Sequence, residues 1–258
     1  MEGGPRHVYL PPVTLVCVGL YGSASTWLYN ACRRVLACDS RELRIASFFS
    51  DRPLSEDGGT PGAPSPFATP GWDAAVVKMH EGSAEALELI NSEGVQVLIT
   101  IRDPRDCLIS VMDRFGWRFE TALDRIEASL RLVDRVLQVP GALILRYEEG
   151  FMREVGTLQR IARCLARDLD EETSSRLFAE LTPARIDGLT RDYSANDETL
   201  GTNPAGRLFH RISHWHQGHC GDGAIGKWRY SLRPAQEALV RARIWREITR
   251  LGYAGHGR

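Results

Sequence analysis

The feature that most constrains the fold is a strand, loop and helix pattern near the start of the chain. Residues 13–18 form a short apolar run rich in β-branched side chains, which is typical of a buried strand. A loop of glycines and hydroxyl residues follows at 19–26, and residues 27–36 have apolar side chains at helical spacing. Backbone amides at a helix N-terminus attract anions, so this order predicts a phosphate-binding loop in an α/β protein.

The same alternation of short strands and helices continues along the chain. Further strands are expected at residues 74–78, 95–101 and 142–145, and helices at 83–91, 107–112, 119–137, 152–165, 171–181 and 234–251. Such alternation predicts a parallel sheet with helices on both faces, a three-layer α/β/α fold. We expect one domain over residues 1–258, with long loops at 51–71 and 186–224 that shape a substrate pocket.

Composition excludes two classes of partner. The chain carries 32 Lys and Arg against 33 Asp and Glu, so its formal net charge is −1. A general nucleic-acid-binding protein is clearly basic, and no apolar run here reaches the about 18 residues that span a bilayer. Residues 1–5 also lack the basic-then-apolar order of a signal peptide. We therefore expect a cytoplasmic protein that binds neither nucleic acid nor membranes.

The cysteine and histidine patterns indicate no metal site. None of the six cysteines forms a C-x-x-C pair. Four histidines cluster at positions 210, 214, 216 and 219, but zinc takes about four ligands and this run has only the single Cys220 beside it. We expect reduced cysteines and no bound metal. The histidine-rich segment either borders a substrate pocket or is a plain structural loop.

Five segments, read in chain order, resemble the sulfotransferases that use 3′-phosphoadenosine 5′-phosphosulfate (PAPS). The loop YGSASTW at 21–27 is similar to the family's Pro-Lys-Ser-Gly-Thr-Thr-Trp, and VVKMH at 76–80 to its Lys-Thr-His segment. The segment RDPRDCLIS at 102–110 keeps the family's spacing between Arg and Ser in Arg-Asn-Pro-Lys-Asp-x-x-x-Ser. RYEE at 146–149 and GAIGKWR at 223–229 are similar to Tyr-Glu-Asp and Gly-x-x-Gly-Asp-Trp-Lys. Five motifs in the family's order make the resemblance more specific than any one of them.

The resemblance implies a donor site built from these motifs. The hydroxyls and amides of the first loop would hold the 5′-phosphosulfate, Arg102 and Ser110 the 3′-phosphate, and Trp27 and Tyr147 the adenine. A helix cap, an Arg–Asp ion pair and core aromatic residues are the structural alternatives. The expected donor-binding residues are Gly22, Ser23, Ala24, Ser25, Thr26, Trp27, Arg102, Ser110, Tyr147, Gly223, Gly226 and Lys227.

The resemblance also implies the catalytic groups. His80 stands at the position of the family's catalytic base, although a surface histidine is the plain alternative. Gly22 replaces the loop lysine, and Asp222 stands where the family carries a cation. Another cation must then meet the negative charge that develops during transfer. We expect Lys78 and Lys227, the only lysines in the sequence, to do this, against the alternative of solvated surface charges.

The expected function is transfer of the sulfuryl group from PAPS to a hydroxyl or amine of a small-molecule or carbohydrate acceptor, releasing PAP. An ATP-dependent small-molecule kinase is one alternative, which the missing P-loop lysine opposes. A degenerate protein of the same fold, binding PAP or a partner without catalysis, is another. The resemblance is compatible with a homodimer, and the arginine-rich composition suggests a bacterial source.

Overall fold

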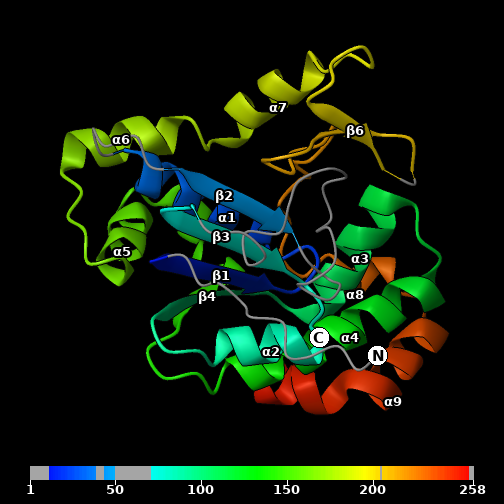
Figure 1. The fold of residues 1–258 in the computed structure, drawn as a ribbon. Coiled ribbons are helices and arrows are strands. Elements are labelled where there is room, and N and C mark those ends of the chain that lie inside the picture. The colour runs from blue at the N-terminus through cyan, green and yellow to red at the C-terminus, as the bar shows by residue number, and fades with distance from the viewer. Residues whose placement is uncertain (1–11, 39–43, 50–70, 204, 256–258) are drawn as a thin grey trace, which may run out of the picture.

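The sheet is the centre of the molecule. The computed structural model describes residues 12–38, 44–49, 71–203 and 205–255, so nearly all of the loop expected at 51–71 lies outside the described residues. Five parallel strands pair in the order β2-β3-β1-β4-β5 (Figure 1). The strands are β1 (Val13–Gly19), β2 (Ile45–Phe49), β3 (Ala74–Met79), β4 (Val95–Ile101) and β5 (Leu143–Arg146).

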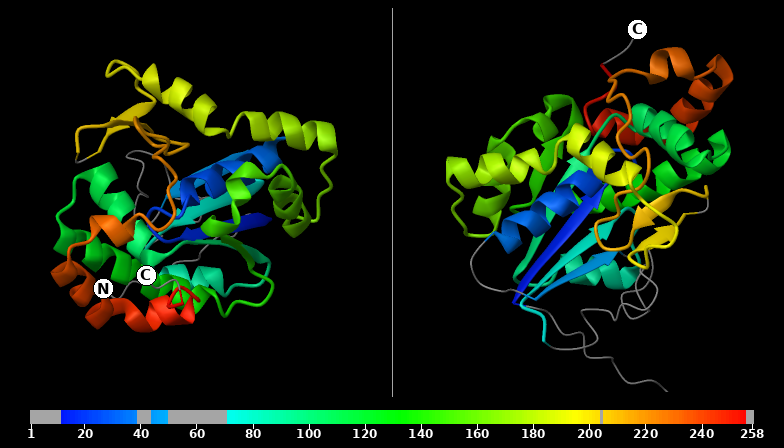
Figure 2. Two further views of the ribbon diagram at one scale, coloured as in Figure 1. Left: turned by 180° about the vertical axis from the view of Figure 1, so that it is seen from behind. Right: turned by 90° about the horizontal axis from the view of Figure 1, so that it is seen from above.

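The alternating side chains of β1 explain the three layers. Val16 and Val18 are buried in one hydrophobic cluster, whereas Leu15 and Cys17 are buried in another on the opposite face. A central strand that is covered on both faces has a continuous apolar sequence, and β1 has one. Helices α2 (Ala84–Ile90), α3 (Pro104–Phe115), α4 (Phe119–Val136) and α9 (Pro234–Arg250) contribute to the first cluster, and α1 (Ser25–Ala37), α5 (Gly156–Cys164) and α6 (Glu171–Ala179) to the second. Figure 2 shows helices on both faces, which confirms the expected α/β/α fold.

One edge of the sheet collects the segments that the sequence singled out. Because the strands are parallel, their carboxyl ends lie together, and open α/β sheets bind ligands outside this edge. The small-residue loop follows β1, His80 follows β3, Arg102 follows β4 and Tyr147 follows β5. Four strands therefore deliver the candidate site residues to one place.

Three expectations about secondary structure need correction. The stretch 186–224 is not one extended loop, because α7 (Pro183–Arg191) runs into it and the short antiparallel strands β6 (Leu200–Thr202) and β7 (Leu208–His210) lie within it. Thr182 caps α7, and only two of its residues are buried, so the helix shows little apolar periodicity. Helix α5 begins at Gly156, after two 3-10 turns, instead of at residue 152. The edge strand β2 was not expected from its five-residue run.

Candidate functional site

The loop between β1 and α1 presents backbone amides to an anion. Ala24, the residue before α1, has a left-handed backbone with φ 67°, and its side chain makes no capping hydrogen bond. The first-turn amides of this 13-residue helix therefore have no side-chain cap, which suits an anion at the helix N-terminus. The structural alternative of a serine cap does not apply at this position.

The hydroxyl of Ser23 serves the fold. Its Oγ donates to the carbonyl of Leu20 at 2.7 Å and lies 2.8 Å from Thr100 Oγ1 at the end of β4. Ser23 is fully buried. The side chain thus anchors the loop to the sheet instead of facing a ligand, which corrects the expectation that its hydroxyl holds a phosphosulfate.

Lys78 and His80 lie beside this loop, at the end of the neighbouring strand β3. Lys78 Nζ donates to Thr26 Oγ1 at 2.8 Å, and His80 Nδ1 lies 2.7 Å from the carbonyl oxygen of Gly19. Both side chains are buried, with 6% and 5% exposure. Register explains the contact, because β1 and β3 pair directly from Val13 to Val18.

The hydrogen bond to Gly19 determines the tautomer of His80. A carbonyl oxygen only accepts, so Nδ1 carries the proton and Nε2 of the neutral ring carries the lone pair. Burial and then the nearby charge of Lys78 hold the pKa of His80 well below its usual value of 6.5. Tyr21 stacks on the ring with centroids 4.1 Å apart. The residue is thus a neutral, oriented imidazole at ordinary pH.

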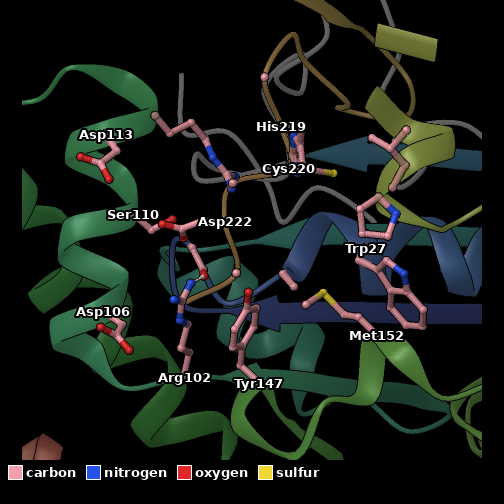
Figure 3. A pocket seen from close by; sticks show the side chains of 18 of the residues that line it. Trp27, Arg102, Asp106, Ser110, Asp113, Tyr147, Met152, His219, Cys220 and Asp222 are labelled. Atoms are coloured by element: carbon pink, nitrogen blue, oxygen red, sulfur yellow. Dashed lines mark hydrogen bonds between the residues drawn. The ribbon is translucent and has the colours of Figure 1, made fainter. Parts of the chain in front are cut away.

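Arg102 follows β4 and faces the other side of the loop. Its NH1 donates to the carbonyl of Gly22 at 3.1 Å and its NH2 to that of Ala224 at 2.7 Å, while its Nε is a buried donor without a partner. The guanidinium lies over the ring of Tyr147 at 4.1 Å (Figure 3). This position leaves a buried cation available to an anionic ligand.

The two neighbouring aspartates do not neutralise Arg102. Asp103 forms a buried two-bond pair with Arg105, at 2.9 and 2.7 Å. Asp106 accepts the backbone amides of Gly226 at 2.6 Å and Trp228 at 3.0 Å. The structural alternative of an ion pair from Arg102 to either carboxylate is therefore wrong.

Two cavities open at this edge of the sheet. The larger has a volume of about 460 Å³ and the smaller about 210 Å³. Predicted residues that line the larger cavity are Gly22, Ala24, Trp27, Arg102, Ser110, Tyr147, Gly223 and Lys227. Those that line the smaller cavity are Gly22, Ala24, Ser25, Thr26, Lys78 and His80. The loop after β1 thus belongs to both cavities, whereas Ser23 and Gly226 line neither.

Aromatic side chains form one wall of the larger cavity. Trp27 is only 4% exposed, donates from Nε1 to the carbonyl of Leu181 at 3.1 Å and packs edge-on against Phe151. It is a core residue that also lines the cavity, and its contact with adenine stays a prediction. Figure 3 shows Trp27 and Met152 on the side opposite Ser110 and Asp113 of α3.

Lys227 lies in an ion-pair cluster at the rim of the larger cavity. Its Nζ is 2.7 Å from Asp113 Oδ2 and 3.2 Å from Asp222 Oδ2. The hydrogen bond to Asp113 is the main cause that raises the pKa of Lys227, with Asp222 adding to it. Lys227 is thus neither a lone surface charge nor a group in the smaller cavity beside His80.

Sequence reasoning missed three arginines, whereas the histidine-rich segment does border a cavity, which was one of its two predicted roles. Arg114 lines both cavities, whereas Arg153 and Arg207 line the larger. The histidines at 214, 216 and 219 line the smaller cavity, and burial holds the pKa of each below its usual value. The spacing from Ser110 to Arg114 is one helical turn, a signal that could have identified Arg114.

Within the described ranges, no group of three or more His, Cys, Asp or Glu side chains is arranged to hold a metal ion. The histidine-rich segment instead packs ring against ring, with the centroids of His216 and His219 4.2 Å apart.

Comparison with solved structures identifies the architecture. The mouse sulfotransferase SULT7A1 complexed with PAP superposes with a TM-score of 0.64 at 12% identity, covering 94% of this chain and 87% of that chain. Retinol dehydratase in complex with androsterone and the inactive cofactor PAP gives 0.63 at 16% identity, covering 94% and 82%. The chain has the sulfotransferase fold.

The likeness is one of structure. No protein-family model matches the sequence, and no curated protein matches it by sequence. No helix among the described residues is long and apolar enough to cross a bilayer.

Proposed function

We propose that the protein is a sulfotransferase that moves the sulfuryl group from PAPS to an acceptor hydroxyl or amine and releases PAP. The observation that carries this proposal is the pair of cavities that share the loop after β1. A buried arginine lines the larger cavity, and an oriented neutral histidine lines the smaller. Such an arrangement suits in-line transfer between a bound nucleotide and a bound acceptor.

The larger cavity fits the donor nucleotide. Arg102 supplies a buried cation whose Nε has no partner, and Ser110 adds a hydroxyl from α3. The faces of Trp27 and Tyr147 suit an adenine ring. The uncapped N-terminus of α1 suits the 5′-phosphosulfate. The PAP in the similar solved structures supports the same assignment.

The smaller cavity fits the acceptor. In the proposed reaction the acceptor oxygen gives its proton to Nε2 of His80 and forms a bond to sulfur. The bond between sulfur and the phosphate oxygen breaks, and its electron pair leaves with PAP. Lys78, held by Thr26, places a positive charge beside the loop. Lys227, in this scheme, neutralises Asp222 at the rim of the donor cavity.

The lining of the smaller cavity favours a small acceptor with an apolar body. Tyr21, Phe115 and Phe209 supply aromatic surface to a volume of about 210 Å³. A phenol or another small alcohol therefore suits it better than an extended carbohydrate. Cytoplasmic location, bacterial source and a homodimer stay predictions.

A second candidate function is PAP binding without catalysis. Gly22 in place of the loop lysine and Asp222 at the phosphate-binding segment favour it. The two candidates make different predictions about turnover, because a silent binding protein takes up PAP and transfers nothing.

The test of the proposed function is release of PAP from PAPS over a panel of phenols, alcohols and sugars. We expect turnover with the wild type and a loss of about 10²- to 10⁴-fold in His80→Asn, since the side-chain amide can still donate to Gly19 but cannot act as a base. PAP binding should stay unchanged in that variant. Magnesium-dependent use of ATP with no response to PAPS would favour the kinase. PAP binding without turnover would favour the protein that binds PAP without catalysis.

A further inference from the structure

The backbone and surroundings of Gly22 disfavour the lysine that the sulfotransferase loop motif carries at this position. Its φ is +80°, in the left-handed region that favours glycine. A β-carbon at this position would lie 3.0 Å from Ser110 Cβ and 3.3 Å from the carbonyl oxygen of Cys107. A side chain at this position would therefore be strained and would press against helix α3, so another element has to supply the missing cation.

Helix α3 itself brings a cation to this place. Arg114 lies one turn beyond Ser110, the residue that touches Gly22, and lines both the larger and the smaller cavity. No carboxylate forms an ion pair with it among the residues that the structure describes. Burial lowers the pKa of Arg114 to about 10, with a contribution from the nearby Arg102, so the guanidinium is still charged at neutral pH.

The other cations of the site have different positions. Lys78 lines the smaller cavity and donates to Thr26, whereas Lys227 lines the larger and is held by two aspartates. Arg102 lines the larger cavity and donates to two backbone carbonyls. Of the Lys and Arg side chains in the described ranges, Arg114 alone borders both cavities.

We infer that Arg114 contacts the sulfuryl group during transfer and takes the place of the loop lysine. This inference rests on the proposed function, in which the sulfur lies where the two cavities meet. As the acceptor oxygen bonds to sulfur and its proton passes to His80, the bond to the phosphate oxygen of PAP breaks with its electron pair. A planar guanidinium binds two oxygens of such a group and offsets the charge that moves across it.

The test compares two ligands that differ only in the sulfuryl group. Isothermal titration measures PAPS and PAP binding to the wild type, Arg114→Met, Arg114→Lys and Arg207→Met, without any acceptor. Arg207 is the matched control, because it lines the larger cavity only. We expect Arg114→Met to weaken PAPS binding by about 10- to 100-fold with little change in PAP binding. Arg114→Lys should recover part of the lost PAPS affinity. Arg207→Met should change both ligands equally.

Each other outcome overturns the inference. If Arg114→Met weakened the binding of PAPS and PAP equally, Arg114 would lie at a phosphate. If the affinity for neither ligand changed, Arg114 would lie at the acceptor. If the wild type bound PAP but not PAPS, the site would not accommodate a sulfuryl group. Failure of the wild type to bind PAP would overturn the proposed function itself. Thermal unfolding in the presence of PAP shows whether each variant is folded. If Arg114→Met does not fold, Arg114→Lys still allows the comparison of PAPS with PAP.

Discussion

At the scale of single residues, the proposed base His80 depends on its burial and on one hydrogen bond. Burial and the charge of Lys78 lower the pKa of His80, so its ring is neutral. The carbonyl of Gly19 accepts a hydrogen bond from Nδ1 and so determines which nitrogen holds the proton. A base at ordinary pH needs both conditions, because a charged imidazole accepts no proton and a misoriented one presents the wrong nitrogen.

The pH profile tests this account of His80. A lowered pKa means that the neutral base persists as the pH falls, so the acid limb of kcat/KM should lie below about pH 6.5. Lys78→Met removes the nearby charge that lowers the pKa of His80, and should move this limb to higher pH. The measurement is the pH dependence of PAP release by both proteins. A limb that stays in place, or moves to lower pH, would contradict the assignment.

Asp222 is the residue that departs most from a phosphate-binding role. A hydrogen bond from the Ala224 amide, and then Lys227, lower the pKa of Asp222, so the carboxylate is charged beside the larger cavity. Asp222→Asn should tighten PAP binding by about 2- to 10-fold at low salt and by less at high salt, since screening weakens the repulsion. Titration calorimetry at two salt concentrations measures this. The exposed Asp192→Asn, which lines neither cavity, is the control, and weaker binding in Asp222→Asn would refute the repulsion.

At the scale of elements, α3 organises the site more than any strand. Its residues Ser110 and Arg114 face the loop and the cavities, and Asp106 holds the segment before α8 (Trp228–Ser231) through two backbone amides. Motif spacing singled out Ser110. Helical spacing from Ser110 could have pointed to Arg114, but the close approach of α3 to Gly22 joins residues 80 or more positions apart and is not visible in the sequence.

Asp106 offers a test at this scale. Asp106→Asn places an NH2 donor against one of the two amides, so the free energy of unfolding should fall by about 1–3 kcal/mol and PAP binding should weaken with it. Denaturant unfolding measures the first effect and calorimetry the second. Asp134→Asn, which breaks an exposed ion pair with Arg250, is the matched control and should cost less than about 1 kcal/mol. Equal effects of the two substitutions would contradict the account.

At the scale of the whole molecule, the sequence predicted the sheet better than the segment that covers the site. Long apolar runs such as β4 and long periodic helices such as α4 and α9 had clear signals. Strands of three residues such as β6 and β7 are too short to show alternation, and the cap of α7 carried more information than its apolar pattern. The loop hydroxyl of Ser23 turns inward because the carbonyl of Leu20 and, on another strand, Thr100 provide its partners. Such long-range contacts are not readable from spacing.

The measurement that tests the central claim most directly is titration of the protein with PAP, with magnesium ATP as the control ligand. We predict micromolar binding of PAP, about −8 kcal/mol, much weaker binding of ATP, and loss of PAP binding in Arg102→Ala with the fold intact by circular dichroism. Absence of PAP binding by the wild type, or equal binding of ATP, would contradict the account and leave the likeness to sulfotransferases as one of fold only.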